Sequence, residues 1–272
     1  MLSKISFGEK GLFFIIALFL LVFLVGPVIQ VFYVAFIDVN TNTLTLNNFA
    51  DFFSTSLFRE SFYNSFYVSA MSVVVASIIA LPLAYYTSRF EFKGSVIIQS
   101  LGFIPLIMPP FVGAVAMQLF FGENGSVNLY LENTFGFKIP FMDGLNGVIF
   151  VQSIHYFPFI LLNLSAALNN IDKSMEESAQ NLGSRGFGLF RKIVFPLAMP
   201  GYIAGAVLVF IKVFDDLGTP LLLNVNNMLA PQAYLRISSI GIDDPMGYVI
   251  AVVLVVFSLA ALGIAGWALK GK

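Results

Sequence analysis

The sequence of 272 residues lacks cysteine and has a single histidine, His155. The absence of cysteine excludes disulfide frameworks, thiol catalysis and metal sites built from thiolates. With one histidine, a His-rich metal site is excluded as well, together with most histidine-based catalysis. Charged residues make up only 11% of the chain, against about 25% in a typical soluble domain. The net charge of −1 argues against a basic nucleic-acid-binding surface, so we expect no nucleic-acid partner.

Hydrophobic residues are abundant in their place, at 58% of the chain, and phenylalanine alone contributes 31. A helix that crosses a lipid bilayer needs roughly 20 mostly apolar residues. The sequence therefore predicts an all-α integral membrane protein, a single domain over residues 1–272. We expect six transmembrane helices, at about 11–37, 61–88, 94–122, 144–171, 193–216 and 245–269. A further uncharged stretch, 217–235, is rich in proline and asparagine and is expected to be an extracytoplasmic loop or a partly embedded hairpin.

The basic residues give the expected orientation. With the N-terminus inside, ten Lys and Arg residues fall on the cytoplasmic side and only Arg59, Lys138 and Arg236 fall outside. This is the bias expected of a membrane protein, and a seventh span would place Lys270 and Lys272 outside. Both termini are thus expected in the cytoplasm. The first apolar run is too long for a signal peptide and lacks a cleavage site, so we expect an uncleaved helix.

Two of the predicted spans contain residues that alter helix geometry. Pro105 and the pair Pro109-Pro110 lie in the third span, where they produce either simple bends or a deformable, cavity-lining segment near residues 108–111. The fifth span begins with Gly201 and Gly205, four residues apart. This spacing of small residues permits close approach of a neighbouring helix.

Residues 172–192 form the longest predicted cytoplasmic loop, and they have a helical pattern of their own. Ser174 and Glu177 have the spacing of a capping box, which predicts a helix start. Met175, Ala179 and Leu182 then recur as one apolar face of a short helix.

Gly183 stands where the loop helix is expected to end, because glycine adopts the left-handed conformation without steric cost. A second short turn, with Phe187, Phe190 and Val194 on one side, leads into the fifth span. The loop is therefore expected to be a stiff helix–turn–helix that docks into a groove of another protein.

The same loop carries a motif. The pattern E-x-A-x-x-x-G-x(9)-I-x-x-P, formed by Glu177, Ala179, Gly183, Ile193 and Pro196, resembles the EAA motif of binding-protein-dependent ABC importer permeases. Ser178 and Phe195 stand where the family usually has Ala and Leu. The strings IPLIMPPFVGAVA, FGENGSVN and FDDLGTPLLL are also similar to the ferric-iron, polyamine and phosphonate branch of these permeases.

The resemblance implies a type I ABC importer permease fold, in which the loop 172–192 contains the coupling helix. It implies a non-catalytic subunit in a prokaryotic inner membrane, forming half of a translocation pathway. The implied partners are a dimer of ABC ATPase subunits, a second permease subunit (identical or paralogous) and an extracytoplasmic substrate-binding protein. ATP and Mg would be bound by the ATPase, and no cofactor by this chain. The residues expected to couple to the ATPase are Glu176, Glu177, Ala179, Leu182, Gly183, Phe187 and Phe190.

The solute is less well determined by the sequence. Many ferric-iron permeases of the branch are fused, double-length chains, and the shorter chain favours a polyamine, a phosphonate or another small polar solute, with ferric iron still among the candidates. Charged groups at membrane depth are candidates for a substrate path, and Lys212, Asp215 and Asp216 cluster there. Alternatively, Lys212 and Asp216 form a neutral structural pair on one helix face. Polar residues of other spans, Asn64, Gln118 and His155, are further candidates for the path.

Two other classes of protein compete with this interpretation. A self-contained secondary transporter or channel would need no ATPase, but inverted repeats or more buried ionisable groups would be expected. An integral-membrane enzyme would need an acid–base constellation, and no catalytic residue or metal ligand is predicted in the loops.

Overall fold

The computed structural model describes residues 7–240 and 244–270, and the regular elements in these ranges are helices. Lys4 and Lys272, which contributed to the expected orientation, lie outside the described residues. Five helices are long and apolar enough to cross a membrane, and a sixth span is obtained if one bent pair is counted as a unit. The described residues therefore have an all-α architecture of five or six candidate spans.

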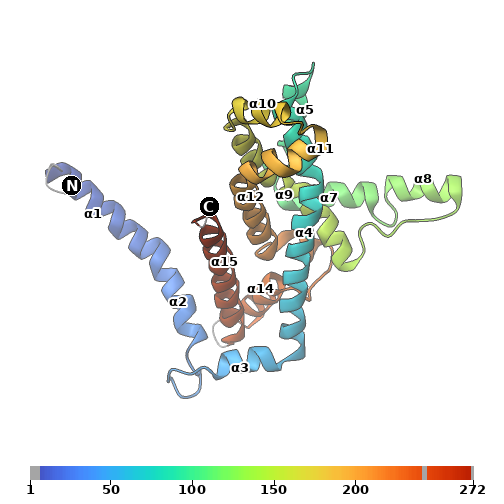
Figure 1. Cartoon of the computed structure of the whole chain (residues 1–272). Helices are drawn as coiled ribbons and strands as arrows, with labels where there is room; N and C mark the ends of the chain where they lie inside the picture. Colours follow the sequence, from blue (N-terminus) through green and yellow to red (C-terminus); the bar gives the residue numbers. More distant parts are fainter. Residues whose placement is uncertain (1–6, 241–243, 271–272) are drawn as a thin grey trace.

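The elements follow one another along the chain in the order that Figure 1 shows. The first apolar segment comprises α1 (Phe7–Leu20), a π-helical turn (Leu21–Val25) and α2 (Gly26–Ala35). It is followed by α3 (Asn47–Ser54), α4 (Ser56–Arg89), α5 (Ser95–Gly102), α6 (Ile104–Ile107), α7 (Pro110–Phe121), α8 (Ser126–Phe135) and α9 (Gly144–Asn169). The remaining elements are α10 (Lys173–Asn181), α11 (Gly186–Leu189), a π-helical turn (Phe190–Val194), α12 (Phe195–Phe214), α13 (Gly218–Leu222), α14 (Leu229–Ser239) and α15 (Met246–Lys270).

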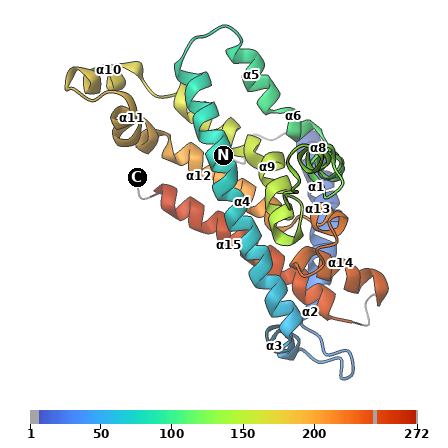
Figure 2. The same ribbon diagram turned by 90° about the vertical axis from the view of Figure 1, so that its right-hand side faces the viewer.

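Helices α4, α9 and α12 pack against one another and form the centre of the molecule, which we call the three-helix core (Figures 1 and 2). The face of α4 in this core consists of small side chains, among them the fully buried Ser69, Ala76 and Ala80. On α12, a Cβ atom added to Gly205 would lie 2.7 Å from the Cα of Ile160 in α9. The close approach predicted from the Gly201–Gly205 spacing is therefore confirmed.

The predicted third span, residues 94–122, is not one continuous helix. Its two halves, Ser95–Ile107 and Pro110–Phe135, are bent by 108°. Met108 precedes Pro109, and the proline ring disfavours a helical conformation of the preceding residue. Met108 is accordingly extended, with ψ 136°, and so is Pro109, with ψ 139°. The break falls in the segment 108–111 that the prolines singled out, and it directs α7 away from the axis of α4 (Figure 1).

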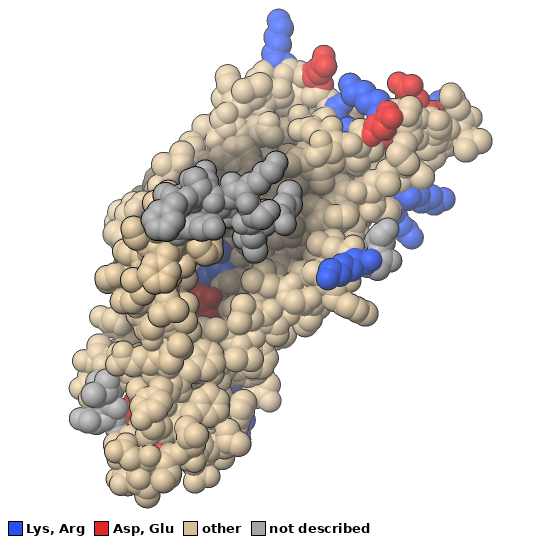
Figure 3. Space-filling model, turned by 90° about the vertical axis from the view of Figure 1, so that its left-hand side faces the viewer, with Lys and Arg blue, Asp and Glu red and all other residues tan. Residues whose placement is uncertain are grey.

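Two segments extend away from the three-helix core in Figure 1, namely the α1–α2 arm on one side and α7 with α8 on the other. Along the arm, the residues from Gly11 to Gln30 are all exposed. The arm meets the body near Ala35, which is buried in a cluster with Val249 and Ile250 of α15. Figure 3 shows that charged side chains gather near the end of the molecule that carries α10 and α11 and are sparse over the rest of this face.

The stretch 217–235 folds into a hairpin of α13 and α14, which we call the α13–α14 hairpin. Thr219, Met228 and Leu229 within it are almost fully buried. It is fixed to α4, because Asn64 Nδ2 donates to the carbonyl of Asn227 at 2.9 Å and the Leu229 N–H donates to Ser65 Oγ at 2.9 Å. The stretch is thus helical and packed among the other helices, and whether it is partly embedded in the membrane stays a prediction.

Candidate functional site

The loop 172–192 contains the predicted helix α10, but its cap differs from the expected one. Asp172 is the N-cap residue, and its carboxylate accepts a hydrogen bond from the Ser174 N–H at 2.9 Å. This hydrogen bond lowers the pKa of the Asp172 carboxyl. The capping box that began at Ser174 is wrong, because the helix already begins at Lys173. Asp172 and Ser174 are both good caps, and the earlier residue takes the position.

The end of α10 agrees with the prediction. Gly183 has φ +91°, in the left-handed region that favours glycine. Its N–H donates to the carbonyl of Gln180 at 2.9 Å, and the N–H of Ser184 donates to the carbonyl of Ala179 at 3.0 Å. These two bonds form a Schellman motif, which satisfies carbonyls that the helix end would otherwise leave free. Helix α10 is thus closed by hydrogen bonds at both ends.

The apolar residues of the loop divide into an inner and an outer set. Ala179 is buried in the core cluster with Leu189 of α11 and Val194 of the π-helical turn that follows. Met175, Leu182 and Phe187 are 49%, 90% and 76% exposed. The predicted single face of Met175, Ala179 and Leu182 is therefore wrong, since only Ala179 packs inward. The outer set provides an exposed apolar surface beside the exposed Glu177.

The second half of the loop, from Gly186 onward, continues without interruption into α12. Helix α11, the π-helical turn and α12 together form one apolar helical unit from Gly186 to Phe214. Phe190, in the π-helical turn, packs edge-on against Tyr85 near the end of α4, with ring centroids 4.8 Å apart. A displacement of the loop is therefore connected by continuous backbone to one helix of the three-helix core and by side-chain packing to another.

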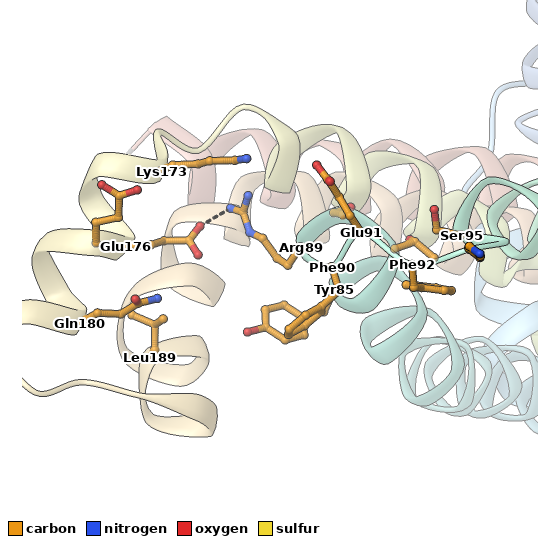
Figure 4. Close-up of a pocket in the computed structure, with 14 residues that line it drawn as sticks. Tyr85, Arg89, Phe90, Glu91, Phe92, Ser95, Lys173, Glu176, Gln180 and Leu189 are labelled. Carbon is orange, nitrogen blue, oxygen red and sulfur yellow. Dashed lines mark ion pairs between the residues drawn. The ribbon is translucent and has the colours of Figure 1, made fainter.

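A cavity of about 740 Å³ lies between α10 and the end of α4. Figure 4 shows Arg89 and Glu176 pointing toward one another across it, with Lys173 and Glu91 nearby. The distance from Arg89 Nη2 to Glu176 Oε1 is 2.6 Å, and the side chains are only 9% and 14% exposed. The approach is oblique, so the contact is an ion pair without a well-formed hydrogen bond. Glu176 thus faces the body of the protein, whereas Glu177 is exposed.

The two acids expected in a substrate path lie in different surroundings. Asp216 accepts a hydrogen bond from Gln152 Nε2 at 2.7 Å and receives the N–H groups of Gly218 and Thr219 at 3.2 and 3.4 Å. Asp215 instead receives the hydroxyl of Ser258 in α15, at 3.2 and 3.3 Å. Asp216 therefore caps α13 and binds α9, while Asp215 remains exposed.

The alternative in which Lys212 pairs with Asp216 is wrong for the described residues. Helix α12 ends at Phe214, so Asp216 is no longer one turn above Lys212 on the same helix. None of the ion pairs between described residues includes Lys212, which is exposed. Lys212 on α12 and Asp215 directly after it are thus both exposed on the isolated chain.

The polar candidates of the other spans do not converge on one site. Asn64 holds the α13–α14 hairpin, as described above. Gln118 lines an open cavity of about 590 Å³ together with Glu123 and Asp143. His155 lines a separate apolar cavity of about 80 Å³ with Met108 and Gly113.

Two residues that matter in the structure had only weak signals in the sequence. In the sequence, Arg89 is one of the ten cytoplasmic basic residues, and its position directly after an apolar span is the signal that it offers. Ser258 lies in the last apolar helix, where a lone serine gives no indication of a contact with Asp215.

Comparison with known proteins places the chain among membrane transport proteins. The family described as "Binding-protein-dependent transport system inner membrane component" matches residues 72–270. A putative ferric transport system permease protein of Haemophilus influenzae is 28% identical over 265 residues, which cover 94% of this chain and 41% of that protein. A probable molybdenum ABC transporter permease protein of Haloferax volcanii is 30% identical and is covered over 71% of its length, by 73% of this chain.

The chain spans about two fifths of the length of the ferric transport relatives it matches. Among solved structures, a chain of a bacterial ABC transporter involved in the import of the acidic polysaccharide alginate superposes with a TM-score of 0.74 at 18% identity. That alignment covers 94% of this chain and 94% of the other. At this identity, the likeness is evidence for the fold alone.

Proposed function

The chain belongs to the family of binding-protein-dependent transport system inner membrane components, and from that premise we propose that it is a permease subunit of an ATP-driven importer. In this proposal the chain forms half of a translocation pathway in a prokaryotic inner membrane, with both termini in the cytoplasm. A second permease, identical or related, forms the other half. An extracytoplasmic binding protein delivers the solute, and a dimer of ABC ATPase subunits binds ATP and Mg.

The observation that carries the proposal is the form of the loop 172–192. Helix α10 is closed by Asp172 at its start and by the Schellman motif of Gly183 at its end. The loop presents Met175 of α10, Leu182 directly after α10 and Phe187 of α11 outward, which is the arrangement of an amphipathic element that docks into a groove. A short, stiff helix transmits the movement of a docked ATPase, whereas a flexible loop would absorb it. This chain therefore supplies the mechanical coupling and leaves ATP hydrolysis to its partner.

The exposed surface of the isolated chain supports a second permease subunit. Lys212 and Asp215 are exposed on or next to α12, and a charged group in contact with lipid at membrane depth costs about 2.5–3.5 kcal/mol on insertion scales. In the assembled importer this side of α12 faces the second permease and the path between the two subunits. The path admits a small polar solute, with a polyamine, a phosphonate, ferric iron and molybdenum oxyanions as the candidate classes.

The coupling role is tested by substituting Gly183. In Gly183→Val a β-branched residue is forced into φ +91°, so the end of α10 is distorted. We expect co-purification with the ATPase and substrate-stimulated ATP hydrolysis both to fall about tenfold, which corresponds to about 1.4 kcal/mol of lost interaction. The matched control is Gly188→Val, since Gly188 has open space around it and no left-handed φ. Equal behaviour of the two variants contradicts the coupling role, and solute transport by the purified chain alone down an ion gradient contradicts the proposal as a whole.

The path is tested separately at Asp215. Asp215→Asn keeps the shape of the side chain and removes its charge, so uptake kinetics are expected to change while assembly with the ATPase does not. Unchanged uptake would mean that Asp215 has only a structural role, as the acceptor of the hydrogen bond from Ser258.

A further inference from the structure

We propose that Arg89 is a positioning residue that fastens the coupling helix α10 to the end of α4, so that a displacement of α10 is carried directly into α4. The proposal rests on the proposed function, because it assigns a role in transmitting motion from the ATPase. It adds a route that the loop sequence does not contain, since the backbone connects the loop only to α9 and α12. The route depends on the ion pair between Arg89 and Glu176.

The first step is that α10 has few other attachments to the body. Ala179 is its only buried residue among those described, and its side chain is a single methyl group. Glu176, one turn before Ala179, is the other member of the helix that turns inward. Without the ion pair, the orientation of α10 relative to α4 would depend on one small apolar contact and on the two ends of the loop.

The second step concerns the environment of the pair. Both side chains are at least about four-fifths shielded from solvent, so the attraction is screened less than in a surface ion pair. Removing one partner leaves the other charge shielded and unpaired, which is costly. Other charged groups line the same cavity, notably Lys173, Lys93, Glu91 and Glu177, but no ion pair is formed between any of these and Arg89 or Glu176. The connection is therefore specific to these two residues.

The third step is that α4 holds the loop at two points one turn apart. Arg89 contacts α10 in the first half of the loop. Tyr85 packs edge-on against Phe190, which lies in the second half. A tilt of the whole loop moves both contacts together, whereas a separation of the two halves of the loop strains both contacts. Two attachment points fix the orientation of the loop relative to α4, which a single contact would not do.

The last step follows α4 to its other end. Helix α4 is continuous from Ser56 to Arg89, and near its start Asn64 and Ser65 hold the α13–α14 hairpin through hydrogen bonds of 2.9 Å. A movement that enters α4 at Arg89 is thus connected to the hairpin at the opposite end of the molecule. The ion pair gives the ATPase a mechanical route to that end that does not pass through α9 or α12.

The test is a charge exchange in the reconstituted importer with its ATPase and binding protein. Arg89→Glu and Glu176→Arg are each expected to lower the amount of solute moved per ATP hydrolysed by about tenfold. In Arg89→Glu, basal ATP hydrolysis and co-purification are expected to stay within about twofold of wild type. The double variant restores an ion pair of opposite direction and is expected to recover at least about half of the coupling. Wild-type coupling in the single variants, or no recovery in the double variant, overturns the proposal.

Conservative and matched variants separate positioning from general damage. Because the contact is oblique and made by one guanidinium nitrogen, Arg89→Lys keeps the charge and is expected to retain most of the coupling, whereas Arg89→Gln is not. Lys93→Gln and Glu91→Gln change charges of the same cavity outside the ion pair and are expected to behave as wild type. Equal loss in Lys93→Gln and Arg89→Gln would show that cavity charge, and not the pair, is responsible, and would overturn the proposal.

A second measurement does not depend on the ATPase. The chain has no cysteine, so spin labels can be placed at Ile78→Cys on α4 and Gln180→Cys on α10 of the membrane-embedded chain. Arg89→Gln is expected to broaden the distribution of distances between the labels, and the charge exchange is expected to narrow it again. An unchanged distribution overturns the positioning role. If the wild-type chain fails to bind the ATPase, the proposed function fails, and this distance measurement still decides the role of Arg89.

Discussion

The three-helix core and the α1–α2 arm are both strongly apolar, but their side chains are used differently. In the core, α4 contributes serine and alanine to its contact with α9, and α12 approaches α9 so closely that Gly205 admits no Cβ. In the arm, leucine, isoleucine and phenylalanine are exposed along its length. Because lipid tails are as apolar as leucine, burial of large side chains drives helix association weakly in a bilayer, and close backbone approach becomes important.

The comparison explains why one region is fixed by its own contacts and the other is not. The arm satisfies its backbone hydrogen bonds internally, which is what a helix in hydrocarbon requires, and its side chains suit contact with lipid or with a second chain. The core depends on shape, so a change of one carbon atom matters there. Substitutions of equal chemistry should therefore have unequal effects in the two regions.

The largest expected effect comes from filling the close contact at Gly205. A side chain at this position would lie 2.7 Å from the Cα of Ile160, and backbone cannot move aside as a flexible side chain can. We expect Gly205→Leu to lower the free energy of unfolding by about 3 kcal/mol or more, measured by thermal unfolding of the purified chain in lipid nanodiscs. The matched control is Gly263→Leu in α15, where no neighbour lies within 4 Å and stability should be nearly unchanged. Similar losses in both would show that close approach is not what distinguishes the core.

The next effect compares one truncation in the two regions. Leu164 in α9 is almost fully buried, whereas Leu18 in α1 is exposed. Leu164→Ala leaves a cavity and is expected to cost about 2 kcal/mol or more, whereas Leu18→Ala should cost close to nothing in the isolated chain. Both are measured by the same unfolding experiment. If Leu18→Ala is as destabilising as Leu164→Ala, then the α1–α2 arm packs against the rest of the chain. That result would contradict the distinction between the arm and the three-helix core.

The two neighbouring acids provide a smaller contrast. Asp216 accepts three hydrogen bonds that join α9 and α13, whereas Asp215 accepts hydrogen bonds from one group alone, the hydroxyl of Ser258. Asp216→Ala is expected to lower the free energy of unfolding by about 2 kcal/mol, and Asp215→Ala by less than about 1 kcal/mol. Hydrogen exchange of residues 218–222 should show local opening in Asp216→Ala alone. Opening in both variants would mean that the acids act as one structural unit.

Much of this architecture could be predicted from the sequence, for identifiable reasons. The spans predicted at 144–171 and 245–269 differ by at most two residues at either end from α9 and α15, because polar or charged residues flank uninterrupted apolar runs. The end of α10 at Gly183 could be predicted because a single residue type satisfies that backbone conformation. Such features depend on local sequence, which a single chain provides in full.

The features that were missed depend on competition or on distance. Prolines at 109 and 110 indicate a bend, but they do not give its angle, which is 108°. Asp172 and Ser174 were both suitable caps, and the pattern alone did not decide between them. The ion pair between Arg89 and Glu176 joins residues far apart in the chain, and no local pattern of the sequence indicates that they are in contact.

The smallest expected effect lies at the start of α10 and depends on pH. The hydrogen bond from the Ser174 N–H holds the pKa of Asp172 below its ordinary value of 3.8, so its contribution to the helix is present above that pH. The contribution is lost as the pH falls through the lowered pKa, where the carboxylate becomes protonated. A spin label at Gln180→Cys should therefore become more mobile as the pH falls below 3.8 in the wild-type chain. Asp172→Asn should abolish this pH dependence while keeping the cap, and Asp172→Ala should be mobile throughout. In Ser174→Ala the backbone N–H remains, so the label is expected to stay ordered at neutral pH. Loss of the Ser174 hydroxyl removes a second hydrogen bond that lowers the Asp172 pKa, so the rise in mobility is expected at a higher pH than in the wild-type chain. A loss of order at neutral pH in this variant would return the cap to Ser174.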